Sequence, residues 1–210
     1  EEKLRKVAPN LVMVSISGFG DTGPYSQRPV YDPLIQGLSG LATVQAGADE
    51  LRPQLVRTIL PDKLTGVTAA QAITAALFAR ERTGESQHVR LSMLDAIIAF
   101  LWSSDMGSQT FVHSEVPQQE AASLQDLIYE TTTGYITIAV QSDREWQALI
   151  RAVDRPEWAE DPRFLTARLR QENIDARLEL IQSVIKTDTA EHWLARLEAE
   201  QVPCAPVLTR

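Results

Sequence analysis

The sequence predicts an α/β protein: part of a parallel sheet with its helices, followed by a small α+β domain of a hairpin and helices. Strand and helix patterns alternate up to residue 104, which is the order of a parallel sheet covered by helices. A polar, irregular stretch follows, and after it come a hairpin pattern and amphipathic helices. We therefore expect a large domain at 1–115, a linker at 116–125 and a small domain at 126–210.

The composition indicates a globular protein with an ordinary core. Of its 210 residues, 44% are hydrophobic and 23% are charged, and the formal net charge is -8. A chain so negative, without a stripe of Lys and Arg, is a poor partner for nucleic acid or anionic membranes. Its most apolar stretch, 93–102, is too short to span a bilayer. The charged opening, 1–6, is unlike a signal peptide.

The single cysteine, Cys204, bears on the compartment. One cysteine cannot form an internal disulfide, and a reducing cytoplasm is the simplest location for such a chain. No local signature surrounds Cys204, so we expect a small buried hydrophobic residue rather than a nucleophile.

The first strand is predicted at 11–17, a continuous β-prone run that suits a parallel sheet covered on both faces. Residues 18–23 then match the GxGxxG pattern of dinucleotide-binding loops. We reject that interpretation, because the fingerprint must open a helix and here Pro24 and Pro29 flank a polar loop. The glycines are expected to allow positive φ and a close approach of the backbone to a ligand or a neighbouring loop.

A helix is predicted at about 31–43, with Leu34, Leu38 and Leu41 along one face. Tyr31 and Asp32 begin it. The Tyr31 ring is expected either to pack with its hydroxyl bonded locally or to contact substrate.

The most informative stretch is 60–67, which carries Asp62 into a helix rich in small residues, 63–83. A partly β-branched run at 55–60 is expected to form a strand, so that Asp62 falls at the N-cap. The free amides and the positive helix end would keep its carboxylate ionised, as an attacking carboxylate must be. Capping is the commoner role of an aspartate there, so position alone leaves both roles open.

Local signals mark the rest of the large domain. Gly84 is placed to end the long helix. A strand is predicted at 87–92, and Ser92 is expected to cap a helix at 93–104. His88 lies in this strand without a titratable partner nearby in sequence, so we expect it to be structural or exposed.

The small domain is predicted from turn and cap signals. Strands at 127–131 and 135–140 flank a glycine-containing turn and form the hairpin. Helices are expected at about 142–153, 169–186 and 190–200, and the first of them opens with a capping box.

Four blocks of the sequence, 15–25, 31–40, 61–66 and 80–89, resemble in their order and spacing the class III CoA-transferases. This CaiB/BaiF-like family includes formyl-CoA and carnitine CoA-transferases and α-methylacyl-CoA racemases. The resemblance covers nearly the whole chain. It implies an internal fragment that holds the second half of a Rossmann-like large domain together with the small domain. It also implies an interlocked homodimer that works in acyl-CoA metabolism.

The resemblance assigns the chemistry to Asp62, which matches the aspartate that carries acyl and CoA groups in the transferases. Attack on an acyl-CoA thioester would give an aspartyl anhydride, then an aspartyl-CoA thioester, from which a small carboxylic acid takes CoA. Such exchange needs no metal and no cofactor other than the CoA thioester that serves as substrate. The further candidates for substrate or CoA binding are Tyr31, Asp32, Gly18, Phe19, Gly20 and Gly66.

Two other functions stay open at this point. The racemase branch carries His where Tyr31 stands, and a phenol with a pKa of about 10 is a poor base at neutral pH, which disfavours α-proton chemistry. A non-catalytic or truncated CoA-binding fragment is the third possibility. It is supported by the greater length of family members and by residues 118–122, which replace the family's Gly-Asn-His-Pro.

Overall fold

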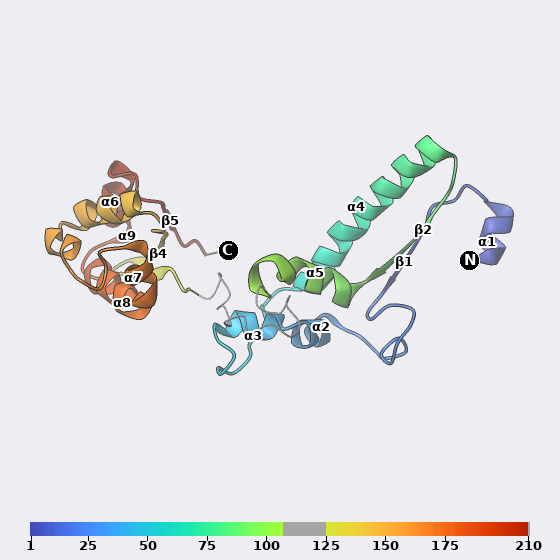
Figure 1. Cartoon of the computed structure of the whole chain (residues 1–210), viewed down its shortest axis with the longest axis horizontal. Coiled ribbons are helices and arrows are strands. Elements are labelled where there is room, and N and C mark those ends of the chain that lie inside the picture. Colours follow the sequence, from blue (N-terminus) through green and yellow to red (C-terminus); the bar gives the residue numbers. More distant parts are fainter. Residues whose placement is uncertain (107–124, 210) are drawn as a thin grey trace. The chain divides into compact units, whose positions relative to one another are not determined.

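The computed structural model describes residues 1–106 and 125–209 (Figure 1). The chain divides into two compact units, Glu1–Gln125 and Asp126–Arg210, which we call unit 1 and unit 2 and describe separately. The expected linker up to residue 124, including the segment 118–122, lies outside the described residues.

Unit 1 is built on a two-stranded parallel sheet. Strand β1 (Met13–Ser17) pairs with β2 (His88–Ser92), from Met13 opposite His88 to Ser17 opposite Ser92. The helices of the unit are α1 (Glu2–Val7), α2 (Asp32–Leu38), α3 (Leu41–Ala46), α4 (Leu60–Thr83) and α5 (Met93–Asp105). The parallel pairing expected for the two strands is confirmed.

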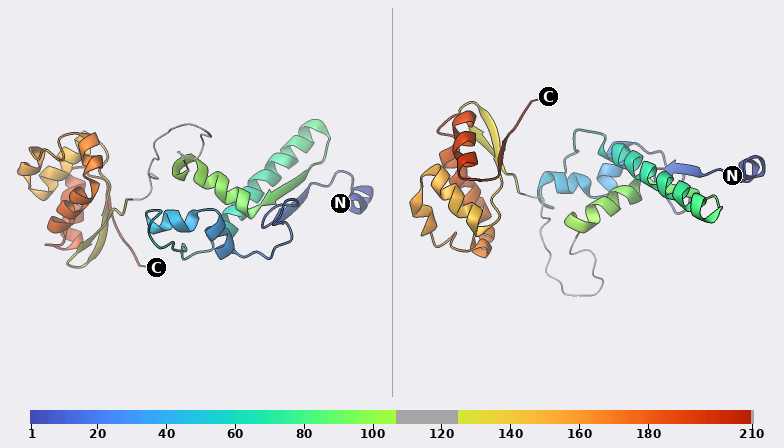
Figure 2. Two further views of the ribbon diagram at one scale, coloured as in Figure 1. Left: turned by 60° about the horizontal axis from the view of Figure 1, so that its bottom comes forward. Right: turned by 90° about the horizontal axis from the view of Figure 1, so that it is seen from above.

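The start of α4 lies where the other helices meet. Figures 1 and 2 show α4 running beside the two strands, with α2, α3 and α5 gathered near its N-terminal end. Four buried side chains from these shorter helices form the apolar cluster of unit 1: Ile35, Leu41, Ile97 and Leu101. Leu60 and Leu64, in the first turns of α4, pack against this cluster and so fix the position of the turn that carries Asp62.

The helix predicted at 31–43 is interrupted. Gly40 adopts a left-handed conformation, with φ of 84°, and separates α2 from α3. The three leucines predicted to share one face differ in burial. Leu41 is 6% exposed, whereas Leu34 and Leu38 are about half exposed, and Ile35 is the fully buried residue of α2.

The strand predicted at 55–60 does not form. The backbone amide of Val56 donates to Gln36 Oε1 over 2.9 Å, and the Val56 carbonyl accepts from Gln36 Nε2 over 3.3 Å. Because a side chain of α2 takes the hydrogen bonds that a neighbouring strand would supply, this segment is coil held against α2.

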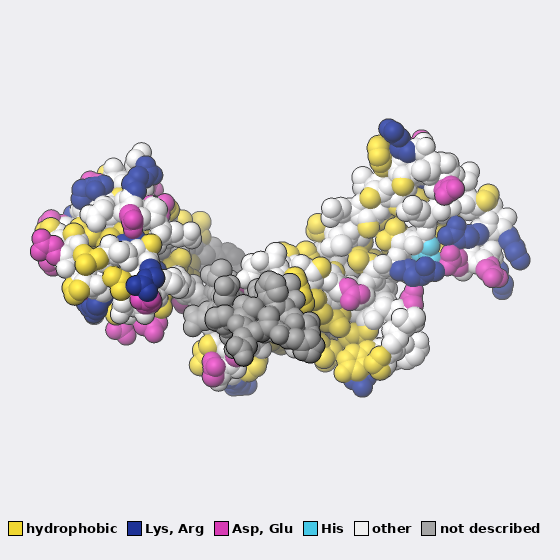
Figure 3. Space-filling view, viewed as in Figure 1, with side chains coloured by type: hydrophobic (Ala, Val, Ile, Leu, Met, Phe, Trp, Pro, Cys, Tyr) yellow, Lys and Arg dark blue, Asp and Glu magenta, His cyan; other side chains and the backbone are white. Residues whose placement is uncertain are grey.

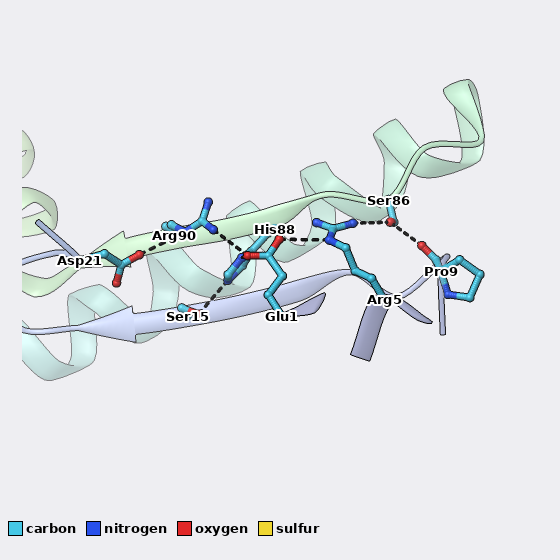
Figure 4. A network of polar contacts seen from close by, with 8 residues as sticks. All are labelled: Glu1, Arg5, Pro9, Ser15, Asp21, Ser86, His88 and Arg90. Atoms are coloured by element: carbon cyan, nitrogen blue, oxygen red, sulfur yellow. Dashed lines mark hydrogen bonds and ion pairs between the residues drawn. The ribbon is translucent and has the colours of Figure 1, made fainter. Parts of the chain in front are cut away.

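A polar network joins α1 to the sheet (Figure 4). His88 Nδ1 lies 2.9 Å from Glu1 Oε2, and His88 Nε2 lies 2.7 Å from Ser15 Oγ. Arg5 and Arg90 also donate to the Glu1 carboxylate. Hydrogen bonds from His88 and then Arg5 lower the pKa of Glu1 to about 2. His88 is therefore a structural residue, as expected, and Figure 3 shows acidic and basic side chains gathered at this end of unit 1.

Unit 2 packs helices against a three-stranded antiparallel sheet of order β3-β4-β5. Its elements are β3 (Ile128–Thr131), β4 (Gly134–Ile138), α6 (Asp143–Val153), the 3-10 helix η2 (Pro156–Ala159), α7 (Ala167–Glu172), α8 (Ile174–Ile185), α9 (Ala190–Ala199) and β5 (Cys204–Pro206). The predicted hairpin and the capping box of Ser142 and Glu145 are confirmed. The helix predicted at 169–186 is divided at Asn173.

Strand β5 was not predicted. It pairs antiparallel with β4, with Cys204 opposite Ile138. Cys204 is half-buried against the core, and this burial raises the pKa of its thiol.

The core of unit 2 is large and rich in aromatic side chains. Trp146 stacks on Trp158 with ring centroids 6.1 Å apart and meets Phe164 edge to face at 5.6 Å. Among the helices of the described residues in either unit, none combines the length and the apolar character needed to cross a bilayer.

Candidate functional site

Asp62 lies in the first turn of α4, but it is not the N-cap. The helix begins at Leu60, earlier than predicted, with Ile59 at the N-cap, and the Ile59 side chain supplies no capping hydrogen bond. The Asp62 side chain is exposed, and no side chain or backbone group of the described residues forms a hydrogen bond or ion pair with its carboxylate. The carboxylate lies at the positive end of the helix macrodipole.

The first turn of α4 is capped from another helix. Asp32, at the start of α2, is 5% exposed, and its Oδ2 accepts a hydrogen bond from the Asp62 backbone amide over 3.2 Å. Its other oxygen, Oδ1, accepts from Gln36 Nε2 over 2.6 Å. Asp32 thereby satisfies one of the free amides of the α4 N-terminus and places two aspartates side by side in the fold.

Tyr31 is the N-cap residue of α2, directly before Asp32. Its side chain is 76% exposed, so it is not the packed aromatic that was one of its two expected roles. Its backbone carbonyl accepts from the amides of Leu34 and Ile35 and so begins the helix. The phenol is left in solvent beside the residue that caps α4.

Residues of the predicted glycine loop, 18–23, have structural roles in unit 1. A Cβ at the buried Gly18 would lie only 2.5 Å from Val30 Cγ1, so a close approach of the chain requires glycine there. Gly20 has φ of +87°, a conformation that L side chains rarely adopt. Phe19 meets Tyr25 edge to face at 5.6 Å and packs against the apolar cluster of unit 1. The close approach expected for this loop is thus to Val30.

Gly66 lies one turn after Asp62 on the same face of α4. Apart from Gly66, its two chain neighbours and the adjacent backbone of α4, no described heavy atom lies within 4 Å of the position that a Cβ on Gly66 would occupy. Glycine therefore leaves open space beside the Asp62 carboxylate, rather than permitting another chain segment to approach.

Gln36 was missed by the sequence analysis. It is 2% exposed and binds both Asp32 and the backbone of the segment before α4. The signal was available, since Asp32 and Gln36 are four residues apart and so face each other on a helix.

No group of three or more His, Cys, Asp or Glu side chains in 1–106 and 125–209 is arranged to hold a metal ion. The chemistry of the site described above is that of carboxylates, an amide side chain and helix N-terminal amides.

The comparison with known families now identifies the class of protein. The family model described as CoA-transferase family III matches residues 1–210. The chain therefore belongs to CoA-transferase family III, in agreement with the resemblance of its four sequence blocks.

Individual relatives are similar over the whole chain. It is 32% identical over 213 residues to the acetyl-CoA:oxalate CoA-transferase of Acetobacter aceti, covering 99% of this chain and 54% of that protein. The succinate–glutarate CoA-transferase of Agrobacterium fabrum is 31% identical over 216 residues, and the match covers 98% of this chain and 52% of that protein. The crystal structure of a CaiB/BaiF family protein from Brucella suis matches with a TM-score of 0.80 and 30% identity, covering 100% of this chain and 56% of that one. The chain spans about half the length of the curated relatives it matches.

Proposed function

We propose that this chain supplies the nucleophile of an enzyme that transfers CoA from an acyl-CoA thioester to a free carboxylic acid. One observation carries the proposal. The Asp62 carboxylate is exposed at the positive end of α4 and forms no hydrogen bond or ion pair within the described residues, while the backbone that presents it is held by the buried Asp32. An attacking carboxylate needs a fixed backbone, an ionised form and unobstructed oxygens.

The proposed reaction proceeds by exchange at Asp62. Its carboxylate attacks the carbonyl carbon of the acyl-CoA, the carbon–sulfur bond breaks, and an aspartyl-acyl anhydride and CoA thiolate result. The thiolate attacks the aspartyl carbonyl and releases the donor acid. The acceptor carboxylate then attacks the aspartyl-CoA thioester, and the freed thiolate takes the acceptor acyl group from the second anhydride. Asp62 is regenerated, and each step replaces one activated acyl bond by another.

The surrounding residues support these steps in specific ways. The positive end of the α4 macrodipole favours the negative charge that develops on the attacked carbonyl oxygens. Asp32 keeps the Asp62 amide in place without engaging its carboxylate. The space beside Gly66 admits the acyl and thioester groups.

The relatives support small carboxylic acids as acceptors. Two of them are named for acetyl-CoA with oxalate and for succinate with glutarate. By extension from the family resemblance, we propose that unit 1 is the second half of a Rossmann-like domain and that the working enzyme is a cytoplasmic homodimer.

The experiment that tests this function is trapping with hydroxylamine. Full-length protein is incubated with a panel of acyl-CoAs, quenched with hydroxylamine, digested with trypsin and analysed by mass spectrometry. Cleavage after Arg57 and Lys63 gives the peptide 58–63, in which Asp62 is the one side-chain carboxylate. We expect a hydroxamate on this peptide and its loss in Asp62→Asn, together with a fall in CoA transfer on the order of 10³-fold or more.

Asp95→Asn is the matched control, since Asp95 is also an exposed aspartate in the first turn of a helix of unit 1. It should load and turn over normally. Absence of the adduct with exchange of the α-proton in deuterated water would instead establish a racemase. Failure to bind any CoA thioester would establish a non-catalytic role.

A further inference from the structure

Gln36 is the most fully engaged polar side chain near Asp62. Its Nε2 lies 2.6 Å from Asp32 Oδ1 and 3.3 Å from the carbonyl oxygens of both Val56 and Thr58. Its Oε1 accepts the Val56 amide over 2.9 Å. A primary amide has two N–H groups, so one of them is given to the carboxylate and the other is shared between the two carbonyls. The short bond to the charged carboxylate is the strongest of the set.

These contacts reach Asp62 by two routes. Through Asp32, Gln36 fixes the carboxylate whose second oxygen holds the Asp62 amide. Through Val56 and Thr58, it fixes the coil that enters α4 at Leu60, two residues before Asp62. The side chain is buried, so water does not compete for these bonds.

We propose that Gln36 is a positioning residue for the transfer reaction. It holds the capping carboxylate and the entering coil in one arrangement, and so sets where the Asp62 carboxylate stands. This inference rests on the proposed function. It predicts that loss of the Gln36 amide slows attack by Asp62 while leaving substrate binding largely intact.

Glutamine is required here because one side chain must donate to a carboxylate and accept from a backbone amide at the same time. Methionine, of similar size, does neither. Glutamate accepts the Val56 amide, but it donates to Asp32 only while it holds a proton. Two ionised carboxyl groups at this separation repel each other, so the last proton of the pair leaves with a raised pKa. The bond to Asp32 is then present at acid pH and is lost as pH rises through that raised pKa.

The test measures hydroxylamine-trapped loading of Asp62 and steady-state CoA transfer in full-length wild type, Gln36→Met and Gln36→Glu, from pH 5 to 8. We expect Gln36→Met to lower kcat by roughly 10- to 100-fold with little change in KM at every pH, as a small misplacement of a reacting group does. Gln36→Glu should approach the wild-type kcat near pH 5 and fall to the methionine level near pH 8. The wild type should show no matching fall.

Gln182 provides the control in unit 2. The Gln182 side-chain amide also binds a backbone: it accepts a hydrogen bond from the Glu130 amide and donates one to the Glu130 carbonyl, both over 2.9 Å. Neither bond involves a carboxylate. Gln182→Met and Gln182→Glu should leave kcat and its pH profile unchanged.

A double variant separates positioning from general stability. Because Gln36 acts in part through Asp32, Asp32→Asn combined with Gln36→Met should lose less kcat than the product of the two single losses. Rates are measured below the melting temperature of each variant, which is determined by circular dichroism.

Additive losses, or a Gln36→Glu variant whose relative kcat is independent of pH, would overturn the proposal. A variant that does not fold under any of these conditions makes Gln36 a stability residue and overturns it too. Wild type that never loads Asp62 is a failure of the proposed function, whereas equal loading of wild type and Gln36→Met is a failure of this inference alone.

Discussion

The two units bury their apolar side chains to different extents. In unit 2, Trp146, Trp158, Phe164 and Trp193 are all buried in one cluster that the sheet and helices enclose. In unit 1, the buried cluster is small, and α4 and α5 expose Phe78, Phe100 and Trp102. Unit 2 is therefore built as an independent hydrophobic core, whereas the described part of unit 1 leaves apolar helix faces uncovered.

The largest expected difference between the units is in how each unfolds when it is produced alone. We predict that 126–209 produced alone unfolds in urea as one cooperative transition, because its core lies within the segment. The segment 1–106 alone should bind the dye ANS and lack a cooperative transition, because its apolar faces stay in water. Circular dichroism and dye fluorescence check this. Cooperative unfolding of 1–106 without dye binding would abolish the contrast.

Replacing single aromatic residues by alanine tests the same difference in burial between the two units. Trp146 is 1% exposed, so Trp146→Ala should destabilise unit 2 by about 3–5 kcal/mol through a cavity in its core. Phe78 is 65% exposed, and Phe78→Ala should change the unfolding free energy of the chain by about 0.5 kcal/mol or less. Urea melts followed by far-UV circular dichroism measure both. Equal losses would show that α4 is covered in solution.

Ionisation of Tyr129 should lower the stability of unit 2 at alkaline pH. Burial raises the pKa of this phenol from 10.0 to about 12, partly offset by the nearby Arg177. The raised pKa means that stability is fully present below pH 10 and is lost as pH rises toward 12, by roughly 2–3 kcal/mol. Unfolding of unit 2 measured against pH should show this fall in wild type and not in Tyr129→Phe. Tyr135→Phe, which removes an exposed phenol of the same hairpin, should keep it.

The smallest effect should be the acid sensitivity of unit 1. The pKa of Glu1 is lowered from 4.5 to about 2, so its contribution is complete above pH 4.5 and disappears as pH falls toward 2. Because Glu1 is open to solvent, we expect local release of α1 from the strands rather than unfolding. The protection of the α1 amides, which is their exchange rate compared with that of an unstructured peptide at the same pH, should fall over this range in wild type. In Glu1→Gln the protection should be low throughout, whereas Glu2→Gln should behave as wild type. Protection of the α1 amides that does not change with pH would disprove the role given to Glu1.

Elements with local signals were predicted from the sequence. Ser92 and Ser142 accept hydrogen bonds from the amides three residues on and begin α5 and α6, and Gly84 ends α4 in the left-handed conformation. Such caps depend on a few neighbouring residues, so the sequence contains the whole interaction.

Features that depend on distant residues were not predicted. The expected strand before α4 is a coil because Gln36, twenty residues away, binds the Val56 backbone. The cap of α4 comes from Asp32, thirty residues before Asp62. Asp62 and Asp32 were both singled out by resemblance, but their contact, and the part taken by Gln36, depend on how α2 packs against α4.

The most direct test of covalent transfer follows oxygen into Asp62. Full-length protein is incubated with an acyl-CoA and an acceptor acid whose carboxylate oxygens are heavy isotopes. The mass of the tryptic peptide 58–63 is then measured by mass spectrometry. Attack by the acceptor on the aspartyl-CoA thioester, followed by thiolate attack on the acceptor carbonyl, leaves one acceptor oxygen on Asp62. We predict heavy oxygen in this peptide after turnover and none without acyl-CoA. Formation of the product thioester with no heavy oxygen in the peptide would contradict the role assigned to Asp62.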